Sequence, residues 1–97
     1  MLKVLIHPAA AAEYAAAFVW YCSRSRRAAV GFEQAVEQAV RLICMHPEAP
    51  PLRDARHRYC KVRKYPYGIV YRVTGDNLRV VAIAHDRQLP EFWLQRD

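Results

Sequence analysis

The sequence predicts an α+β domain in which a small antiparallel β-sheet packs on an N-terminal helical hairpin. Three observations lead to this fold class. Two segments of the first half have apolar residues at helical spacing, the second half is rich in β-branched and aromatic residues, and proline or glycine separates the segments. The expected order along the chain is strand, helix, helix, strand, strand, strand. Because 97 residues suffice for one domain and not for two, we expect a single domain over residues 1–97.

The first half of the chain predicts one short strand and two helices. Residues 2–6 alternate between two faces and predict a strand, and Pro8 suits the first turn of the helix that follows. The alanine-rich run after it has a high intrinsic helix propensity. Ser25 is expected to cap a second helix, whose apolar residues keep a period of about 3.6. This helix should end before Pro47, because a residue that precedes proline avoids the helical region.

The second half predicts three strands. Residues 56–65 alternate between two faces, and residues 69–74 are rich in β-branched and aromatic side chains. Residues 78–85 are apolar at most positions, which is typical of a strand covered on both faces near the centre of a sheet. A hairpin turn around Gly75 should join the last two strands. Residues 89–94 are expected to close the chain with one or two helical turns.

Four aromatic residues have the spacing of core residues, and four histidines need an assignment. Three of the histidines are expected to be solvated or to cap helices, and His85, at the end of a strand, is considered separately below. The aromatic core residues are Tyr14, Phe18, Phe32 and Tyr71, and the three histidines are His7, His46 and His57.

Composition excludes several classes of protein. A hydrophobic content of 54% excludes a disordered chain, and no apolar run approaches the ~20 residues that span a bilayer. Pro8 interrupts the apolar N-terminus, which therefore predicts a strand and not a signal peptide. We expect a cytoplasmic protein without a membrane partner. The three cysteines have neither a C-x-x-C motif nor zinc-site spacing, so we expect small buried thiols, no metal site and no cofactor.

The positive charge is concentrated in one segment. The net charge is +6, and residues 53–64 hold six basic residues against one acidic residue. The rest of the chain holds nine basic residues against eight acidic ones. Such a segment predicts an acidic partner, which is a nucleic acid, an enzyme that acts on nucleic acid, or an acidic peptide.

Two blocks of the second half carry a family resemblance. Residues 64–73, KYPYGIVYRV, have the form K-[FY]-P-Y-x-[IV]-x-Y-x-V, and residues 81–93, VAIAHDRQLPEFW, are similar to [IV]-x-A-[IV]-x-H-x-x-R-x-P-x-[YF]-W with the arginine one position early. Together with Trp20-Tyr21 and the frame formed by Phe32, Ile43 and Pro47, these blocks resemble the RelE/ParE toxin superfamily. The resemblance is to its ParE-like, plasmid-stabilisation branch.

The resemblance implies the toxin of a type II toxin–antitoxin system, held in a hetero-oligomer by a cognate antitoxin encoded beside it. ParE-like members of the family poison DNA gyrase, whereas RelE-like members cut mRNA on the ribosome. We expect a ParE-like toxin that inhibits gyrase by contact and is not itself an enzyme. The alternative is a RelE-like, ribosome-dependent mRNA endoribonuclease. A third class is a plain basic nucleic-acid-binding module or an inactive relic of a toxin.

The endoribonuclease alternative requires catalytic residues. Cleavage through the 2′-hydroxyl needs a base, a proton donor and cations for the developing phosphate charge. Gly68 stands where RelE-like enzymes place an arginine, and Tyr59 stands where they place a lysine, which favours the binding toxin. His85 is a candidate general acid or base because histidine side chains suit proton transfer at physiological pH, although we favour a structural role in which it holds the C-terminal tail or Trp93. The catalytic set of a nuclease would be Lys61, Arg63, His85 and Arg87.

A binding toxin requires a docking surface. Four residues of the predicted strand 56–65, two cations and two aromatic rings, recur at period two, so they are expected to share one face. Cations bind phosphate or carboxylate and rings stack on bases, although a solvated strand face would have the same pattern. The candidate residues for binding target or antitoxin are Tyr59, Lys61, Arg63, Tyr65, Arg72, Arg87 and Trp93.

Overall fold

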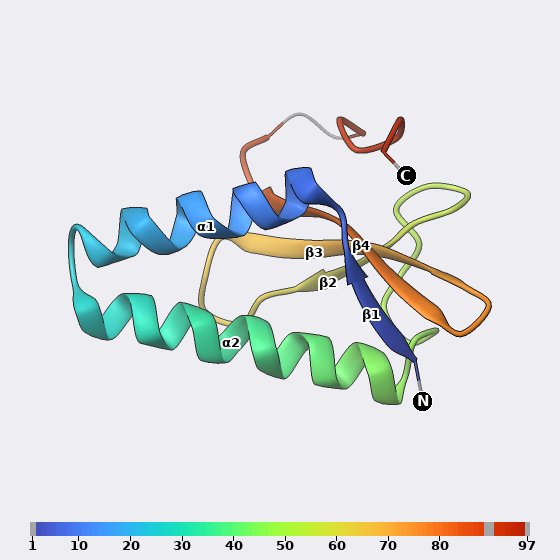
Figure 1. Ribbon diagram of the computed structural model, residues 1–97, viewed down its shortest axis with the longest axis horizontal. Coiled ribbons are helices and arrows are strands. Elements are labelled where there is room, and N and C mark those ends of the chain that lie inside the picture. Colours follow the sequence, from blue (N-terminus) through green and yellow to red (C-terminus); the bar gives the residue numbers. More distant parts are fainter. Residues whose placement is uncertain (1, 89–90, 97) are drawn as a thin grey trace.

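The computed structural model describes residues 2–88 and 91–96 and has the predicted order of elements. In chain order these are β1 (Lys3–Ile6), α1 (Pro8–Cys22), α2 (Arg26–Met45), β2 (Arg58–Lys61), β3 (Tyr67–Thr74) and β4 (Asn77–His85). The two helices form a hairpin that covers one face of the sheet, and the long connection from α2 to β2 leads the chain to the far edge (Figure 1). The α+β prediction is confirmed.

One pair of strands is parallel, so the sheet is not wholly antiparallel as the sequence predicted. The strand order is β1-β4-β3-β2, and the pairs β2–β3 and β3–β4 are antiparallel, but β1 pairs with β4 in parallel. The helical hairpin returns the chain to the end of the sheet at which β1 begins, so β2 runs in the same direction as β1. Two antiparallel turns later β4 has this direction again, and the sheet is mixed. As predicted, β4 lies inside the sheet.

Short-range capping contacts fix the helix ends as expected. The Nδ1 of His7 accepts a hydrogen bond of 3.0 Å from the backbone of Ala9 at the start of α1. Ser25 caps α2 by accepting one of 3.1 Å from the backbone of Ala28, and His46 follows the last residue of α2. The prediction for His57 is wrong, because its side chain is buried with 1% exposed.

The main core lies between the helical hairpin and the sheet. Phe32 is fully buried at its centre, and the rings of Tyr14 and Tyr21 lie 5.5 and 5.2 Å from it. Tyr71 is also fully buried, whereas Tyr14 and Phe18 are partly buried at the margin, so the predicted core residues belong to this cluster. Burying a large apolar side chain stabilises a fold by about 1.5–3 kcal/mol. This cluster therefore fixes the hairpin on the sheet.

The second strand is shorter than predicted. β2 ends at Lys61, and residues 62–66 form a turn in which Lys64 has a φ of 71°. A left-handed residue interrupts the alternation of a strand, and Pro66 has no N–H to donate to a neighbouring strand. Tyr65 consequently points toward the helices, where its hydroxyl donates a 2.9 Å hydrogen bond to the carbonyl of Ala28.

The last elements follow the sequence pattern with local differences. Gly75, with a φ of 61°, lies in the two-residue turn between β3 and β4. Residues 91–95 form turns and not a helix, and of the predicted segment 89–94 the first two residues lie outside the described residues. Cys22 is exposed, contrary to expectation, and Cys44 and Cys60 are partly buried. Within the described chain, neither helix has the length and apolar character needed to cross a membrane.

A substitution at Gly31 tests how the turn of residues 62–66 packs on α2. A Cβ at this position would overlap the hydroxyl of Tyr65, which lies over the helix. Alanine in a helix is favoured over glycine by about 1 kcal/mol, yet we predict that Gly31→Ala lowers the melting temperature by several degrees. The double variant Gly31→Ala/Tyr65→Phe should recover stability, because it removes the overlapping oxygen. A higher melting temperature for Gly31→Ala alone would show that this contact is unimportant.

Candidate functional site

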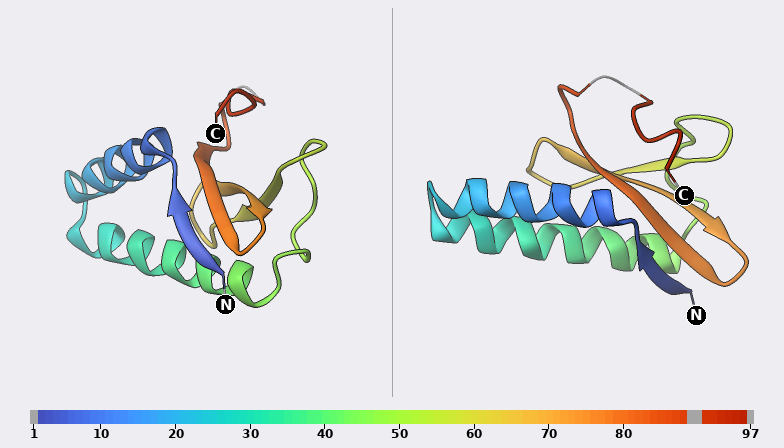
Figure 2. Two further views of the ribbon diagram at one scale, coloured as in Figure 1. Left: turned by 45° about the vertical axis from the view of Figure 1, so that its right-hand side comes forward. Right: turned by 45° about the horizontal axis from the view of Figure 1, so that its top comes forward.

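The C-terminal segment covers the face of the sheet that the helices leave open. Val70 and Val81 are fully buried on this outer face, and Trp93, with 2% exposed, packs against them. Tyr59 and Phe92 lie at the margin of this second cluster. Figure 2 shows the helices on one side of the sheet and the C-terminal segment beside the opposite side. Trp93, which the sequence suggested as a docking residue, is therefore part of the fold.

A single carboxylate holds Trp93 in place. Asp54 accepts hydrogen bonds of 2.9 Å from the indole nitrogen of Trp93, 2.8 Å from the backbone of Arg56 and 2.9 Å from the backbone of His57. The ring Nδ1 of His57 lies 2.9 Å from the same carboxylate. Burial raises the pKa of Asp54, but these hydrogen bonds outweigh it and lower the pKa to about 2. The connection before β2 and the C-terminal segment are thus joined at Asp54.

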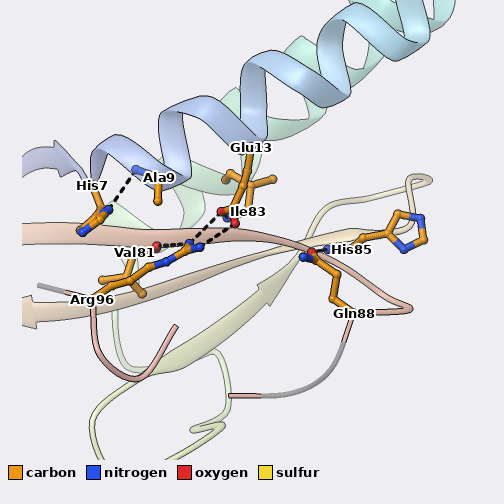
Figure 3. Close-up of polar contacts among 8 residues, drawn as sticks. All are labelled: His7, Ala9, Glu13, Val81, Ile83, His85, Gln88 and Arg96. Atoms are coloured by element: carbon orange, nitrogen blue, oxygen red, sulfur yellow. Dashed lines mark hydrogen bonds and ion pairs between the residues drawn. The ribbon is translucent and has the colours of Figure 1, made fainter. Parts of the chain in front are cut away.

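A second anchor lies at the edge of β4, where β1 has ended (Figure 3). The guanidinium of Arg96 forms two hydrogen bonds of 2.9 and 3.0 Å with the carboxylate of Glu13 and one of 3.0 Å with the carbonyl of Val81. Glu13 also accepts a 3.0 Å hydrogen bond from the backbone of Ile83. Side chains therefore satisfy backbone groups that a neighbouring strand would otherwise bind, and the edge is closed.

Tyr59 and Lys61 meet on the outer face around an acidic residue. The Nζ of Lys61 lies 2.9 Å from the carboxylate of Asp86, and the hydroxyl of Tyr59 donates a 3.2 Å hydrogen bond to it. The hydrogen bond from Lys61 is the main reason why the pKa of Asp86 is lowered. The guanidinium of Arg53 stacks 3.8 Å from the centre of the Tyr59 ring. In this cluster the charge of Lys61 is already paired.

Tyr59 and Gly68, the two departures from the RelE-like pattern, are in direct contact. The Tyr59 ring lies across Gly68, and a Cβ at position 68 would overlap the ring atoms. Any larger side chain at position 68, including the arginine of RelE-like enzymes, would displace the ring. The two departures therefore form one structural unit.

The proposed catalytic residues do not lie in one site. Lys61 is on the outer face, whereas the ring of His85 packs edge-on against Tyr67, 5.0 Å away, on the face that the helices cover. The Nδ1 of His85 accepts a 3.0 Å hydrogen bond from the backbone of Arg87, which is exposed in the turn after β4. Arg63 lies in the turn beside α2. His85 thus has a structural contact, although with Tyr67 and Arg87 and not with Trp93.

The predicted docking face is also divided. Tyr59 and Lys61 share the outer face as expected. Tyr65, however, packs among the core aromatics, and Arg63 lines a groove between α2 and the turn of residues 62–66. The prediction of one alternating face is wrong because the strand ends at Lys61. Two further candidates lie elsewhere: Arg72 is partly buried on β3 beside Pro47 and Glu48, and Arg87 is exposed.

Part of the basic segment has a structural role. Arg58 donates hydrogen bonds of 3.0 and 2.8 Å to the carbonyls of Glu48 and Pro50 and so fixes the connection before β2. Only Arg63 and Lys64, at the end of the segment, reach the groove along α2. Sequence reasoning also missed Glu13, Asp54, Asp86 and Arg96, each of which has at least one side-chain partner far away in sequence. The D-x-x-H spacing of Asp54 and His57 was the one local signal.

An apolar groove lies between β1 and the two helices. It has a volume of about 410 Å³ and is lined mainly by apolar side chains of β1, α1, α2 and β4. At its β1 side Ile6 is 57% exposed and Val4 is 38% exposed. Clustered exposed apolar residues are typical of a surface that binds a partner. Among the described residues no group of histidine, cysteine or carboxylate side chains could hold a metal ion.

Known proteins are similar to this chain in sequence pattern and in fold. Residues 4–90 match the family model of the ParE toxin of the type II toxin–antitoxin system parDE. No curated protein matches the chain. Among solved structures, a chain from the chromosomal ParDE toxin–antitoxin system of P. aeruginosa is similar, with a TM-score of 0.75 and 18% sequence identity over 88% of this chain and 96% of that chain. At this level of sequence identity, the similarity between the two structures concerns the fold alone.

The first prediction from this site concerns pH. The lowered pKa of Asp54 means that its stabilising effect is present above pH 3.8 and is lost as the pH falls toward 2. Asp54→Asn should therefore reduce the free energy of unfolding by on the order of 1–2 kcal/mol at pH 6, and this difference should vanish near pH 2. Denaturant titrations between pH 6 and 2 measure it. Asp76→Asn, at the exposed hairpin turn, is the matched control, and an equal pH profile for both variants would contradict the assignment.

The second prediction concerns the contact between Tyr59 and Gly68. Gly68→Ala should destabilise the fold because the new Cβ overlaps the Tyr59 ring. In the background of Tyr59→Ala the same change should cost less, giving a coupling of roughly 0.5–3 kcal/mol in a double-mutant cycle of denaturant unfolding. Additive effects of the two substitutions would show that the ring does not depend on Gly68.

Proposed function

Because the chain belongs to the ParE toxin family of type II toxin–antitoxin systems, we propose that it inhibits DNA gyrase by direct contact and that a cognate antitoxin neutralises it. Its role as a toxin follows from the family. The choice of gyrase follows from what the ParE-like branch does.

The arrangement of the candidate catalytic residues supports a binding toxin. A ribonuclease needs its base, acid and cations around one scissile phosphate. Here Lys61 is paired with Asp86 on the outer face, whereas His85 contacts Tyr67 on the helix-covered face. The Tyr59 ring also fills the space over Gly68. This separation is the observation that carries the proposal over the RelE-like alternative.

The apolar groove supports an antitoxin partner. Val4 and Ile6 expose apolar surface beside a groove between β1 and the helices, and an amphipathic segment of a partner would bury it. The solved relative is described as a toxin–antitoxin system, and the same kind of complex is proposed for this chain.

We predict that the purified protein blocks the supercoiling of relaxed plasmid by gyrase. Primer extension on mRNA from translating ribosomes should show no new cuts, because no catalytic set is assembled. Relaxation by a topoisomerase other than gyrase serves as the control and should proceed normally. Codon-dependent cuts together with unaffected supercoiling would overturn the proposal in favour of the endoribonuclease. Addition of the product of an adjacent short reading frame should restore supercoiling if that product is the antitoxin.

A further inference from the structure

A second groove, separate from the outer face, lies between α2 and the β2–β3 turn of residues 62–66. It has a volume of about 880 Å³. Its walls carry three cations, Arg27 from the first turn of α2 and Arg63 and Lys64 from the turn, with the amides of Gln34 and Gln38 beside them. No carboxylate lines it. We call these residues the basic groove.

The walls of the basic groove are held at a fixed separation. The hydroxyl of Tyr65 donates a 2.9 Å hydrogen bond to the carbonyl of Ala28, and its ring lies 5.5 Å from that of Phe32. On the other side of the turn, the Nζ of Lys61 donates a 2.6 Å hydrogen bond to the carbonyl of Tyr65. Gly31 leaves room for this close approach. The turn is thus fastened to both α2 and β2, and its two cations lie against α2 without a partner present.

The cations of the basic groove have no acidic partner of their own. Within the part of the chain that the structure describes, Arg27, Arg63 and Lys64 make no ion pair and no side-chain hydrogen bond, unlike Lys61 and Arg96. The stretches 14–32 and 55–75, which include the first turn of α2 and the β2–β3 turn, contain no acidic residue, and Asp86, which lies beside that turn, is paired with Lys61. The first turn of α2 is basic although positive charge there opposes the helix dipole, so this placement costs stability. An anionic ligand would offset that cost.

The ligand recognised by such a groove is selected by charge. Small apolar side chains, among them the exposed Val30, also line the basic groove, but the exposed apolar residues that would anchor a peptide, Val4 and Ile6, border the apolar groove on a different side of α2. We therefore propose that the basic groove binds the phosphate backbone of duplex DNA, independently of sequence. This deepens the proposed function and rests on it in one respect, since gyrase is the enzyme that would present the DNA to the toxin. The binding of DNA by the free toxin does not require gyrase.

The test measures DNA binding by the free protein. The probe is a fluorescein-labelled 20-bp duplex of mixed sequence, titrated by anisotropy between 50 and 200 mM KCl. Three phosphate contacts predict a slope of log K against log salt of roughly −2.7. Arg27→Gln/Arg63→Gln should weaken binding by about tenfold or more at 50 mM salt and make the slope shallower by about 1.8. Circular dichroism melting confirms that the variant is folded.

The control variant removes the same charge elsewhere. Lys3→Gln/Arg41→Gln changes two exposed cations outside the basic groove, so it should retain nearly all the affinity of the wild type. An equal loss in both double variants, or the absence of salt-dependent binding by the wild type, would overturn the inference. A ten-residue polyglutamate peptide that binds the groove when duplex DNA does not would also overturn it and identify an acidic protein segment as the ligand.

The outcomes separate this inference from the proposed function. If the wild type inhibits gyrase but does not bind the duplex, the basic groove is not a DNA site and the proposed function stands. If the wild type binds the duplex through the basic groove but leaves supercoiling intact, the proposed function fails and the inference stands.

Discussion

The covering of the outer face of the sheet depends on the contacts of the Asp54 carboxylate. A sheet with two apolar faces must cover both, and the helical hairpin covers only one. The other face is covered by a few residues of the C-terminal segment, which is too short to form a core of its own. The hydrogen bond from Trp93 to Asp54 fixes this segment, and the pair between Arg96 and Glu13 fixes its end to the edge of β4. The outer face is thereby filled by the chain itself.

This closure determines where function is located. The middle of the outer face, around Val70 and Val81, is covered by Trp93, and Tyr59 lies at its margin. At that margin Lys61 is paired with Asp86, and Tyr59 occupies the space over Gly68. The surfaces left for partners lie on the helical side of the molecule: an apolar groove beside β1 and the basic groove beside the start of α2. This distribution suits a toxin that acts by binding.

Local patterns were sufficient to predict most of the fold. The 3.6-residue period, the cap at Ser25 and the apolar run of β4 depend on neighbours in sequence, and the structure confirms all three. The strand after the helices was predicted too long. The left-handed conformation of Lys64 ends it, and this conformation cannot be seen in the two-residue alternation of side chains along the sequence. With the strand cut short, Tyr65 moved from the predicted docking face into the core.

The candidate site was less predictable because its contacts join distant segments. Trp93 and Asp54 are 39 residues apart and Lys61 and Asp86 are 25 apart, and no periodicity links such pairs. The resemblance correctly drew attention to Tyr59 and Gly68, but only the structure shows that they occupy the same space.

Hydrogen exchange of the two tryptophan indole N–H groups, followed by NMR, tests the closure of the outer face most directly. Trp20 is half exposed on α1, whereas Trp93 is buried and donates to Asp54, so we predict slow exchange for Trp93 and fast exchange for Trp20. Equally fast exchange of both indoles would show that the C-terminal segment does not cover the sheet and that the outer face is open to a substrate.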